Sequence, residues 1–92
     1  GFIPKTIKGK EYIELNYYIE KKYWGNGYAK EIAKALIEYG FITKELEKIV
    51  AIIDPENEPS KEVAKKCGMK YWINEERDNK KKSIYLIKRG EI

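Results

Sequence analysis

Residues Lys48–Ile53 constrain the fold of this chain most, because they form an almost unbroken run of apolar, mostly β-branched side chains. Such a run is typical of a parallel strand that is covered on both faces. A second strand is predicted at Tyr12–Ile19, where residues alternate with the period of a strand that has two different faces. Between the two strands, apolar residues at helical spacing predict a helix from about Tyr28 to Thr43. The predicted apolar positions are Ala29, Ile32, Ala33, Leu36, Ile37, Gly40 and Phe41. Together these segments indicate a βαβ unit with a right-handed crossover.

The rest of the chain predicts one helix and two more strands. We expect a turn over Pro4–Lys10 after the short apolar segment Gly1–Ile3, a helix between the loop Asp54–Ser60 and Gly68, and strands at Met69–Ile73 and Ser83–Arg89 joined by a long loop, Asn74–Lys82. This order of elements indicates an α/β or mixed α+β fold, with residues 1–92 as a single domain.

Composition excludes several classes of site. The chain has no histidine, which excludes histidine-based catalysis and most zinc sites. Its single cysteine, Cys67, excludes an internal disulfide, so we expect a reducing, cytoplasmic setting and a small core residue at this position. No apolar run approaches the roughly 20 residues needed to cross a bilayer. The net charge of +4 suits an anionic cofactor but is weak evidence for nucleic acid.

The junction between the first predicted strand and the first predicted helix carries a glycine turn. Gly25 and Gly27 allow a close backbone approach, and the following helix would present its unpaired N–H groups and positive dipole end to this turn. A strand, a glycine turn and a helix start together form an anion site, usually for phosphate. Two common nucleotide loops do not fit. A dinucleotide fingerprint needs a third glycine where Lys30 stands, and a P-loop needs Gly-Lys-Ser/Thr where Gly27 precedes Tyr28.

Four further features occur in a fixed order along the chain: the segment Trp24–Glu31, the strand Ile49–Asp54, the loop Asn57-x-x-Ser60 and the stretch Val63–Met69. In this order and spacing they resemble the GNAT N-acetyltransferases, and most of all the branch that acetylates ribosomal-protein N-termini and related small amines. The match runs from about Glu14 to Tyr71, roughly two-thirds of the chain. It departs from the superfamily at Lys22, where Gln or Arg is frequent three residues before the first glycine.

The resemblance implies a cofactor and a set of site residues. Acetyl-CoA would lie in a V-shaped cleft between the two parallel strands, with Glu14 as the general base and Ser60 or Tyr71 as the donor to the departing thiolate. The implied cofactor-binding residues are Tyr17, Tyr18, Ile19, Trp24, Gly25, Asn26, Gly27, Tyr28, Ala29, Asn57, Ser60 and Lys66. Simpler roles stay open for two of them, because Asn57 could cap a helix and Ser60 could bond its own backbone.

The chain is shorter than the family it resembles, which usually carries a strand, two helices and further strands before the segment matching Tyr12–Ile19. We therefore expect a truncated GNAT domain in which this strand has a poorly paired edge, and a homodimer that completes the sheet. The alternative from another class is a basic interaction module, with nucleic acid as the less favoured partner. The acceptor amine is not predicted by the sequence.

Overall fold

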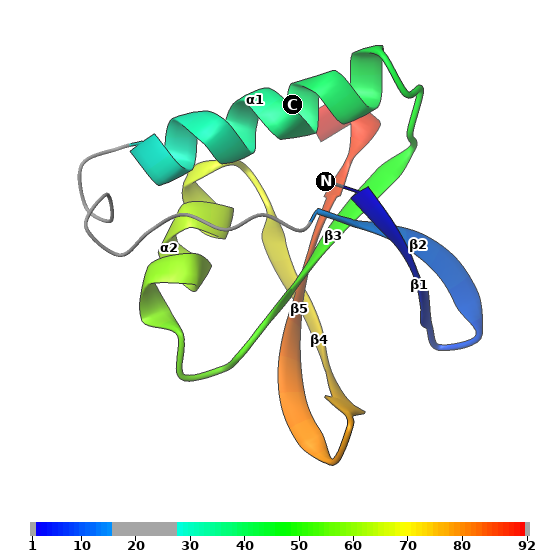
Figure 1. The fold of residues 1–92 in the computed structure, drawn as a ribbon, viewed down its shortest axis with the longest axis vertical. Coiled ribbons are helices and arrows are strands. Elements are labelled where there is room, and N and C mark those ends of the chain that lie inside the picture. The colour runs from blue at the N-terminus through cyan, green and yellow to red at the C-terminus, as the bar shows by residue number, and fades with distance from the viewer. Residues whose placement is uncertain (1, 16–27, 92) are drawn as a thin grey trace.

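The computed structural model describes residues 2–15 and 28–91, which form a five-stranded sheet with two helices (Figure 1). The elements are β1 (Phe2–Ile7), β2 (Lys10–Leu15), α1 (Tyr28–Ile42), β3 (Lys48–Ile53), α2 (Glu58–Lys66), β4 (Lys70–Arg77), β5 (Lys80–Lys88) and a short 3-10 helix, η2 (Arg89–Glu91). The strand order is β1-β2-β3-β5-β4, in which β2 and β3 are parallel and all other pairs are antiparallel. The predicted mixed α/β class and the parallel β2–α1–β3 unit are confirmed.

Helix α1 covers the sheet with a narrower apolar face than the sequence predicts. Ala33, Ile37 and Phe41 are buried, and Gly40 packs so closely that an added Cβ would lie 2.9 Å from the Phe2 ring. The prediction is wrong for Ile32, whose side chain is 45% exposed. This residue stands near the edge of the stripe, about 100° around the helix from Ala33, because consecutive residues turn by roughly 100°.

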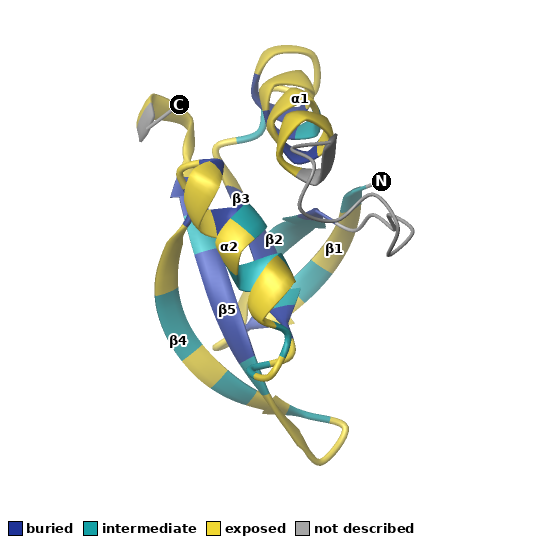
Figure 2. Cartoon of the chain, turned by 90° about the vertical axis from the view of Figure 1, so that its left-hand side faces the viewer, coloured by how far each residue is buried: buried dark blue, intermediate teal, exposed yellow. Residues whose placement is uncertain are grey.

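The core has two parts, one on each face of the sheet. On the helix face, residues of α1 and α2 pack with Ile49, Ala51 and Ile53 of β3. On the opposite face, Ile7, Val50 and Ile84 form a smaller buried cluster. Strand β3 therefore buries side chains on both faces, as the sequence of Lys48–Ile53 predicts. Figure 2 shows α2 lying against the buried residues of β3 and β5.

The first strand of the structure corrects two expectations. Pro4–Lys10 was expected to be a turn, but Phe2–Ile7 is a strand, paired antiparallel with β2 from Phe2↔Leu15 to Ile7↔Lys10. The turn consists of Lys8 and Gly9 alone, whose positive φ angles of 51° and 78° match a two-residue hairpin turn. Consequently β2 is an internal strand and not a poorly paired edge. The predicted continuation of this strand to Ile19 lies outside the described residues.

Among the described residues, β1 is the outermost strand at this end of the sheet, and two of its features hinder pairing with another strand. The two-residue turn makes Ile7 and Lys10 a hydrogen-bonded pair. Hydrogen-bonded and non-hydrogen-bonded pairs alternate along an antiparallel ladder, so the backbone N–H and C=O groups of the alternate residues Phe2, Pro4 and Thr6 point away from β2. Pro4 has no N–H to offer there, which is typical of a protected edge strand. The outward carbonyl of Thr6 already accepts a hydrogen bond from Arg77. For the described part of the predicted strand, Tyr12–Leu15, the open edge on which the predicted homodimer was based is therefore wrong.

The β4–β5 hairpin also differs from expectation, because residues predicted as a long loop are strands. Instead of a loop over Asn74–Lys82, the turn contains only Asp78 and Asn79, with φ angles of 50° and 63°. The charged sequence suits strands here because opposite charges face each other, with Glu75 opposite Lys82 and Glu76 opposite Lys81.

On the face of the sheet that the helices do not cover, here called the open face, side chains of β4 contact β1 and β2. Although β1 and β4 are at opposite edges, Nη2 of Arg77 donates to the Thr6 carbonyl at 2.5 Å. The rings of Tyr12 and Trp72 lie 5.2 Å apart between their centroids. A shift in the β4–β5 register between Tyr71 and Ile73 bends β4 toward this contact. The sheet is therefore curved, and its concave face holds the smaller core cluster.

Candidate active site

A cleft of about 110 Å³ lies where β2 and β3 stop pairing. Within the described part of the chain, the parallel ladder contains only Ile13↔Ile49 and Glu14↔Val50, whereas β3 continues to Ile53. The last paired residues of β2 and β3 thus close one end of the cleft, and side chains of α1 and α2 form its walls. The described lining residues are Glu14, Leu15, Ala33, Ile37, Ala51, Ile52, Ile53, Ser60, Ala64, Cys67 and Met69.

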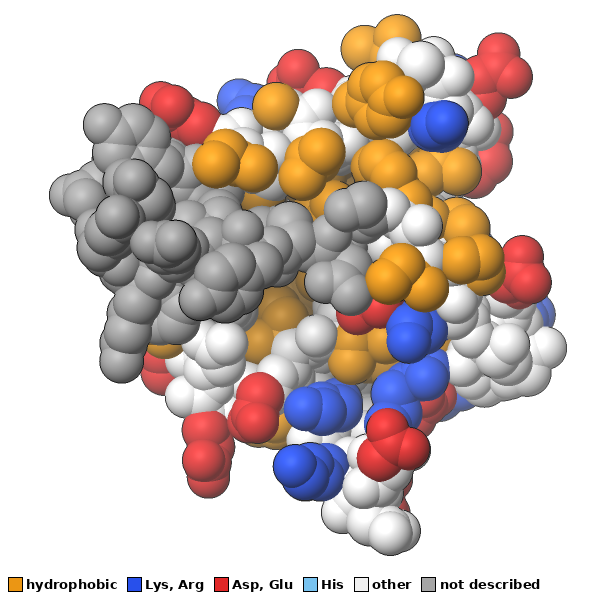
Figure 3. Space-filling model, in the orientation of Figure 1, with side chains coloured by type: hydrophobic (Ala, Val, Ile, Leu, Met, Phe, Trp, Pro, Cys, Tyr) orange, Lys and Arg blue, Asp and Glu red, His pale blue; other side chains and the backbone are white. Residues whose placement is uncertain are grey.

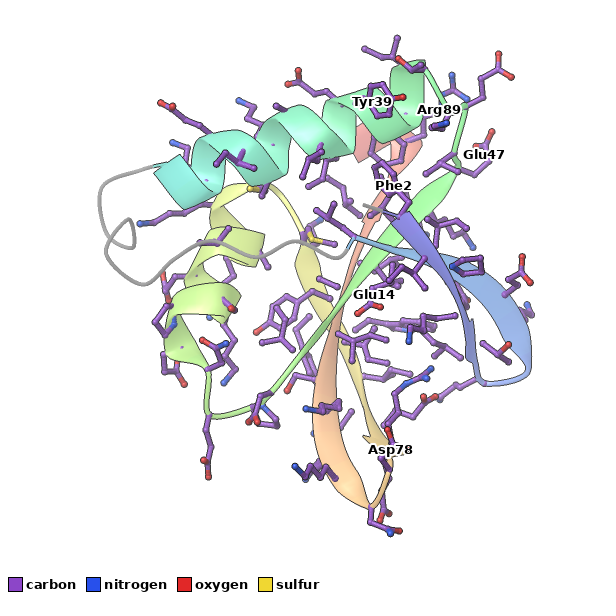
Figure 4. The ribbon with its side chains drawn as sticks, viewed as in Figure 1. Phe2, Glu14, Tyr39, Glu47, Asp78 and Arg89 are labelled. Atoms are coloured by element: carbon purple, nitrogen blue, oxygen red, sulfur yellow. The ribbon has the colours of Figure 1, made fainter. Side chains whose placement is uncertain are left out.

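Glu14 is the acidic residue in this lining, and it is held in a largely buried position. Only 12% of its side chain is exposed, and Figure 4 shows it beside β3. Burial raises the pKa of the Glu14 carboxyl above its ordinary value of 4.5. The charges of Lys5 and Arg77 and the backbone amide of Ile52 oppose this rise by favouring the ionised form. A carboxylate with a raised pKa in a cleft is suited to accept a proton near neutral pH.

The raised pKa of Glu14 predicts a pH dependence of stability. Below 4.5 the carboxyl is protonated in both the folded and the unfolded chain, and as pH rises the unfolded chain ionises first. The stability that this group contributes is therefore complete below 4.5 and is lost as pH rises through its folded pKa. We expect Glu14→Gln to gain stability relative to the wild type between pH 4 and pH 7. Urea unfolding of both proteins at the two pH values measures the change, and an unchanged or opposite difference contradicts it.

Ser60 and Asn57 lie at the start of α2 and form a helix cap. The Asn57 side-chain oxygen accepts a hydrogen bond from the Ser60 backbone N–H at 3.2 Å, and Pro59 occupies the first turn. Ser60 is half-buried and lines the cleft, whereas Asn57 stands outside the described lining. The capping role considered for Asn57 is confirmed, and Ser60 is the hydroxyl that α2 places at the cleft.

Removing this cap should destabilise the protein. We expect Asn57→Ala to lower the free energy of unfolding by about 1 kcal/mol, because an N–H group of the first helical turn loses its acceptor. Asn57→Asp is the matched control, since its carboxylate keeps the acceptor and suits the positive end of the helix dipole. Urea denaturation followed by circular dichroism measures both variants. Equal losses in the two variants would show that the cap oxygen is not the stabilising group.

Cys67 lines the cleft but is poorly suited to be a nucleophile. Its side chain is buried, and its Sγ lies 3.5 Å from the Lys30 carbonyl oxygen. Burial raises the pKa of the Cys67 thiol, and the opposing charges of Lys30 and Lys34 do not cancel this rise. The thiol is therefore mostly protonated at neutral pH, as suits the small core residue that the sequence predicts.

The other predicted site residues are spread over three places. Tyr71 is on β4, is 53% exposed and packs edge-on against Tyr85, so it is not among the described cleft residues. Lys66 is exposed in the last turn of α2. The backbone of Tyr28 and Ala29 begins α1, immediately after the predicted glycine turn. The remaining predicted residues lie outside the described part of the chain, and they are Tyr17, Tyr18, Ile19, Trp24, Gly25, Asn26 and Gly27.

The sequence interpretation missed the two cations close to Glu14. The Nζ of Lys5 lies 3.9 Å from Oε1 of Glu14, and Arg77 acts on the same carboxyl from β4. The Lys8-Gly9 turn could have revealed Lys5, because a hairpin there places it on the same face as Glu14. The approach of Arg77 depends on the curvature of the whole sheet and has no local signal. Among residues 2–15 and 28–91, no group of three or more His, Cys, Asp or Glu side chains could hold a metal ion.

Comparisons with known proteins point to one family. The family model described as "Acetyltransferase (GNAT) domain" matches residues 2–70. An uncharacterized protein of Bacillus subtilis, YkkB, is 39% identical over 85 residues, which cover 92% of this chain and 49% of YkkB. A GNAT-family acetyltransferase structure from Bacillus anthracis superimposes with a TM-score of 0.78 at 30% identity, covering 98% of this chain and 58% of that protein. The structure of the aminoglycoside acetyltransferase AAC(6')-Ib in complex with coenzyme A shares the fold with a TM-score of 0.77 at 18% identity, over 86% of this chain and 46% of that one. The chain thus spans about half the length of these relatives.

Proposed function

Because the chain belongs to the GNAT acetyltransferase family, we propose that it binds acetyl-CoA and transfers the acetyl group to a primary amine, with Glu14 as the general base. The observation that carries this proposal is the position of Glu14, largely buried in the cleft where the β2–β3 ladder ends. A protein N-terminus or a small amine is the proposed class of acceptor. The cleft residues suit this chemistry because they combine a carboxylate with a hydroxyl among apolar walls.

Two residues of the cleft suit acyl transfer, one as a proton acceptor and one as a hydrogen-bond donor. Acetyl-CoA, when bound, provides an activated thioester for the attacking amine. Glu14 accepts the proton that the amine nitrogen loses as its bond to the carbonyl carbon forms. The Ser60 hydroxyl would donate a hydrogen bond to the sulfur and so stabilise the departing thiolate as the carbon–sulfur bond breaks. Ser60 is the better supported donor, because Tyr71 packs against Tyr85 and is outside the described lining.

The proposed cofactor site is built around the start of α1. The N–H groups of the first turn, at Tyr28 and Ala29, have no acceptor within the helix, and in the sequence they follow the predicted glycine turn, so they suit a pyrophosphate. Lys66 is an exposed cation that could meet another phosphate. Asn57 is less available than the sequence interpretation assumed, since its side-chain oxygen already caps α2. The contacts proposed for Tyr17–Ile19 and for Trp24–Gly27 stay predictions.

Calorimetric titration with acetyl-CoA and with CoA tests the cofactor claim directly. We expect saturable binding of both ligands, and absence of binding below millimolar concentration would remove the cofactor and the enzyme claims together. A panel of acceptors that includes an N-terminal peptide, a polyamine and an aminoglycoside, followed by release of the CoA thiol, tests transfer separately. Binding without transfer to any amine would reduce the chain to a cofactor-binding domain.

The interaction-module alternative has less support than acetyl transfer. Figure 3 shows lysine and arginine side chains gathered between the β1–β2 and β4–β5 hairpins. In the β4–β5 hairpin, however, lysines stand opposite acids, with Lys81 opposite Glu76 and Lys82 opposite Glu75, which lowers the attraction for a phosphate backbone. Strong salt-dependent binding to DNA or RNA together with indifference to CoA would favour this alternative. No described helix is long and apolar enough to cross a membrane, while the homodimer and the cytoplasmic location stay predictions.

A further inference from the structure

Charged side chains from three strands meet on the concave face of the sheet. Lys5 of β1 and Glu14 of β2 point to this face, diagonally across the ladder in which Lys5 pairs with Tyr12. The distance from Lys5 Nζ to Glu14 Oε1 is 3.9 Å. Arg77 reaches the same region from β4, at the opposite edge of the sheet.

Arg77 is fixed in place by contacts other than Glu14. Its Nη2 donates to the Thr6 carbonyl, which links β4 to the outer edge of β1. Its Nε lies 2.8 Å from Oε1 of Glu75, but the N–H is not directed at that oxygen, so this contact is an ion pair and not a hydrogen bond. The guanidinium is thus held by β1 and by Glu75, and its charge acts on Glu14 from a fixed position.

The groups that face Glu14 come from every element around it. Lys5 and Arg77 are the cations, and the Ile52 backbone of β3 supplies a hydrogen bond. Glu75, the acid on this side of the sheet, is paired with Arg77. From the helix side, the uncharged Ser60 and Cys67 line the same cleft. The carboxylate therefore lies between two cations on the open face and a neutral wall on the helix face.

We propose that Lys5 and Arg77 are positioning residues for Glu14: the ion pair with Lys5 holds the carboxylate in the gap between β2 and β3, and the fixed charge of Arg77 helps to keep it ionised for the incoming amine. The inference rests on the proposed function, since it assigns Glu14 a proton to accept. Without a nearby cation, burial would raise the pKa of this carboxyl further, so that it would be ionised, and able to accept a proton, over a narrower range of pH. Two cations from opposite edges of the sheet favour the ionised form while leaving the cleft side of the carboxylate open.

The direct test measures the titration of Glu14 itself. In protein labelled with ¹³C at glutamate side chains, we expect Lys5→Met to move the midpoint of the Glu14 carboxyl titration to higher pH and Lys5→Arg to restore it. Lys10→Met is the matched control, because Lys10 is an exposed lysine of the same hairpin and its charge is not among those that act on Glu14. In acetyl transfer, the acidic limb of the rate profile should move with the carboxyl midpoint, which a general loss of structure would not produce.

A pair of Arg77 variants separates charge from hydrogen bonding. Arg77→Lys keeps the positive charge but loses the guanidinium group that donates to the Thr6 carbonyl. The midpoint of the Glu14 carboxyl titration should therefore stay closer to the wild-type value in Arg77→Lys than in Arg77→Met. An unchanged Glu14 midpoint in both Lys5→Met and Arg77→Met overturns the proposal while leaving acetyl transfer intact. Absence of CoA binding and of transfer in the wild type overturns the proposed function, and the positioning role falls with it whatever the titration shows.

Discussion

Glu14→Gln should lower the rate of acetyl transfer by roughly 10²–10⁴-fold while leaving the affinity for CoA nearly unchanged. The amide has almost the size of the carboxyl, so the cleft keeps its shape, but it cannot accept the proton of the amine. Because the Glu14 side chain is only 12% exposed, bulk water is a poor substitute for the lost base. The measurement is release of the CoA thiol, with the best acceptor of the amine panel, over a range of pH.

The control for this variant is Glu11→Gln, which removes an exposed carboxylate from the same strand. It should transfer acetyl groups at the wild-type rate and with the wild-type pH profile. In the wild type, activity should fall as pH drops through the raised pKa of Glu14. The residual activity of Glu14→Gln should not show this fall at acidic pH. A Glu14→Gln enzyme within a few-fold of the wild type would assign the proton transfer to water or to another group.

Phe41→Ala should lower the free energy of unfolding by about 3–5 kcal/mol. Phe41 is only 2% exposed and is among the largest fully packed side chains, on the face of α1 that covers β3. At roughly 0.05–0.15 kcal/mol per residue, a domain of this length has a total stability of about 5–14 kcal/mol. The substitution therefore removes a large share of the total, and the variant should unfold at a much lower urea concentration.

Ile42→Ala is the matched control for Phe41→Ala. The two positions are adjacent in α1, but Ile42 is 75% exposed, so its removal leaves no cavity. We expect a change within about 0.5 kcal/mol, with the better helix propensity of alanine offsetting lost surface contacts. Urea denaturation followed by circular dichroism compares the two. Similar losses at both positions would show that α1 does not bury the face assigned to it.

The parts of the fold that the sequence predicts correctly are those with strong apolar periodicity. Lys48–Ile53 predicts a strand covered on both faces, and the stripe through Ala33 and Ile37 predicts a helix packed on the sheet, as the structure has them. The cleft between the two parallel strands and the place of Glu14 in it were implied by the resemblance to the GNAT N-acetyltransferases and do not follow from periodicity alone. The α2 cap at Asn57 follows from its position just before Glu58-Pro59.

The parts that were wrong are strands whose stability comes from pairing and not from apolar content. β1 contains Pro4, Lys5 and Thr6, and the outer half of the β4–β5 hairpin is almost entirely charged. In each hairpin a two-residue turn fixes the register of the two strands. In the β4–β5 hairpin this register places opposite charges across from each other, and in β1 it places Ile7 in the core. The polar composition of these strands looks like loop sequence when each segment is considered alone. The surroundings of Glu14 were missed for the same reason, since both cations come from these strands.

The hydrogen bond between Arg77 and Thr6 also bears on the order of folding. It joins residues 71 positions apart, whereas each of the two hairpins closes over a two-residue turn. Local hairpins form quickly, and contacts between distant segments form slowly because the chain entropy must be lost first. We therefore expect the two hairpins to dock late. Until the hairpins dock, the Glu14 carboxyl remains hydrated. Docking buries it, and burying an ionised carboxylate costs free energy. Raising the pH should therefore slow the docking step and leave the rate of hairpin formation unchanged.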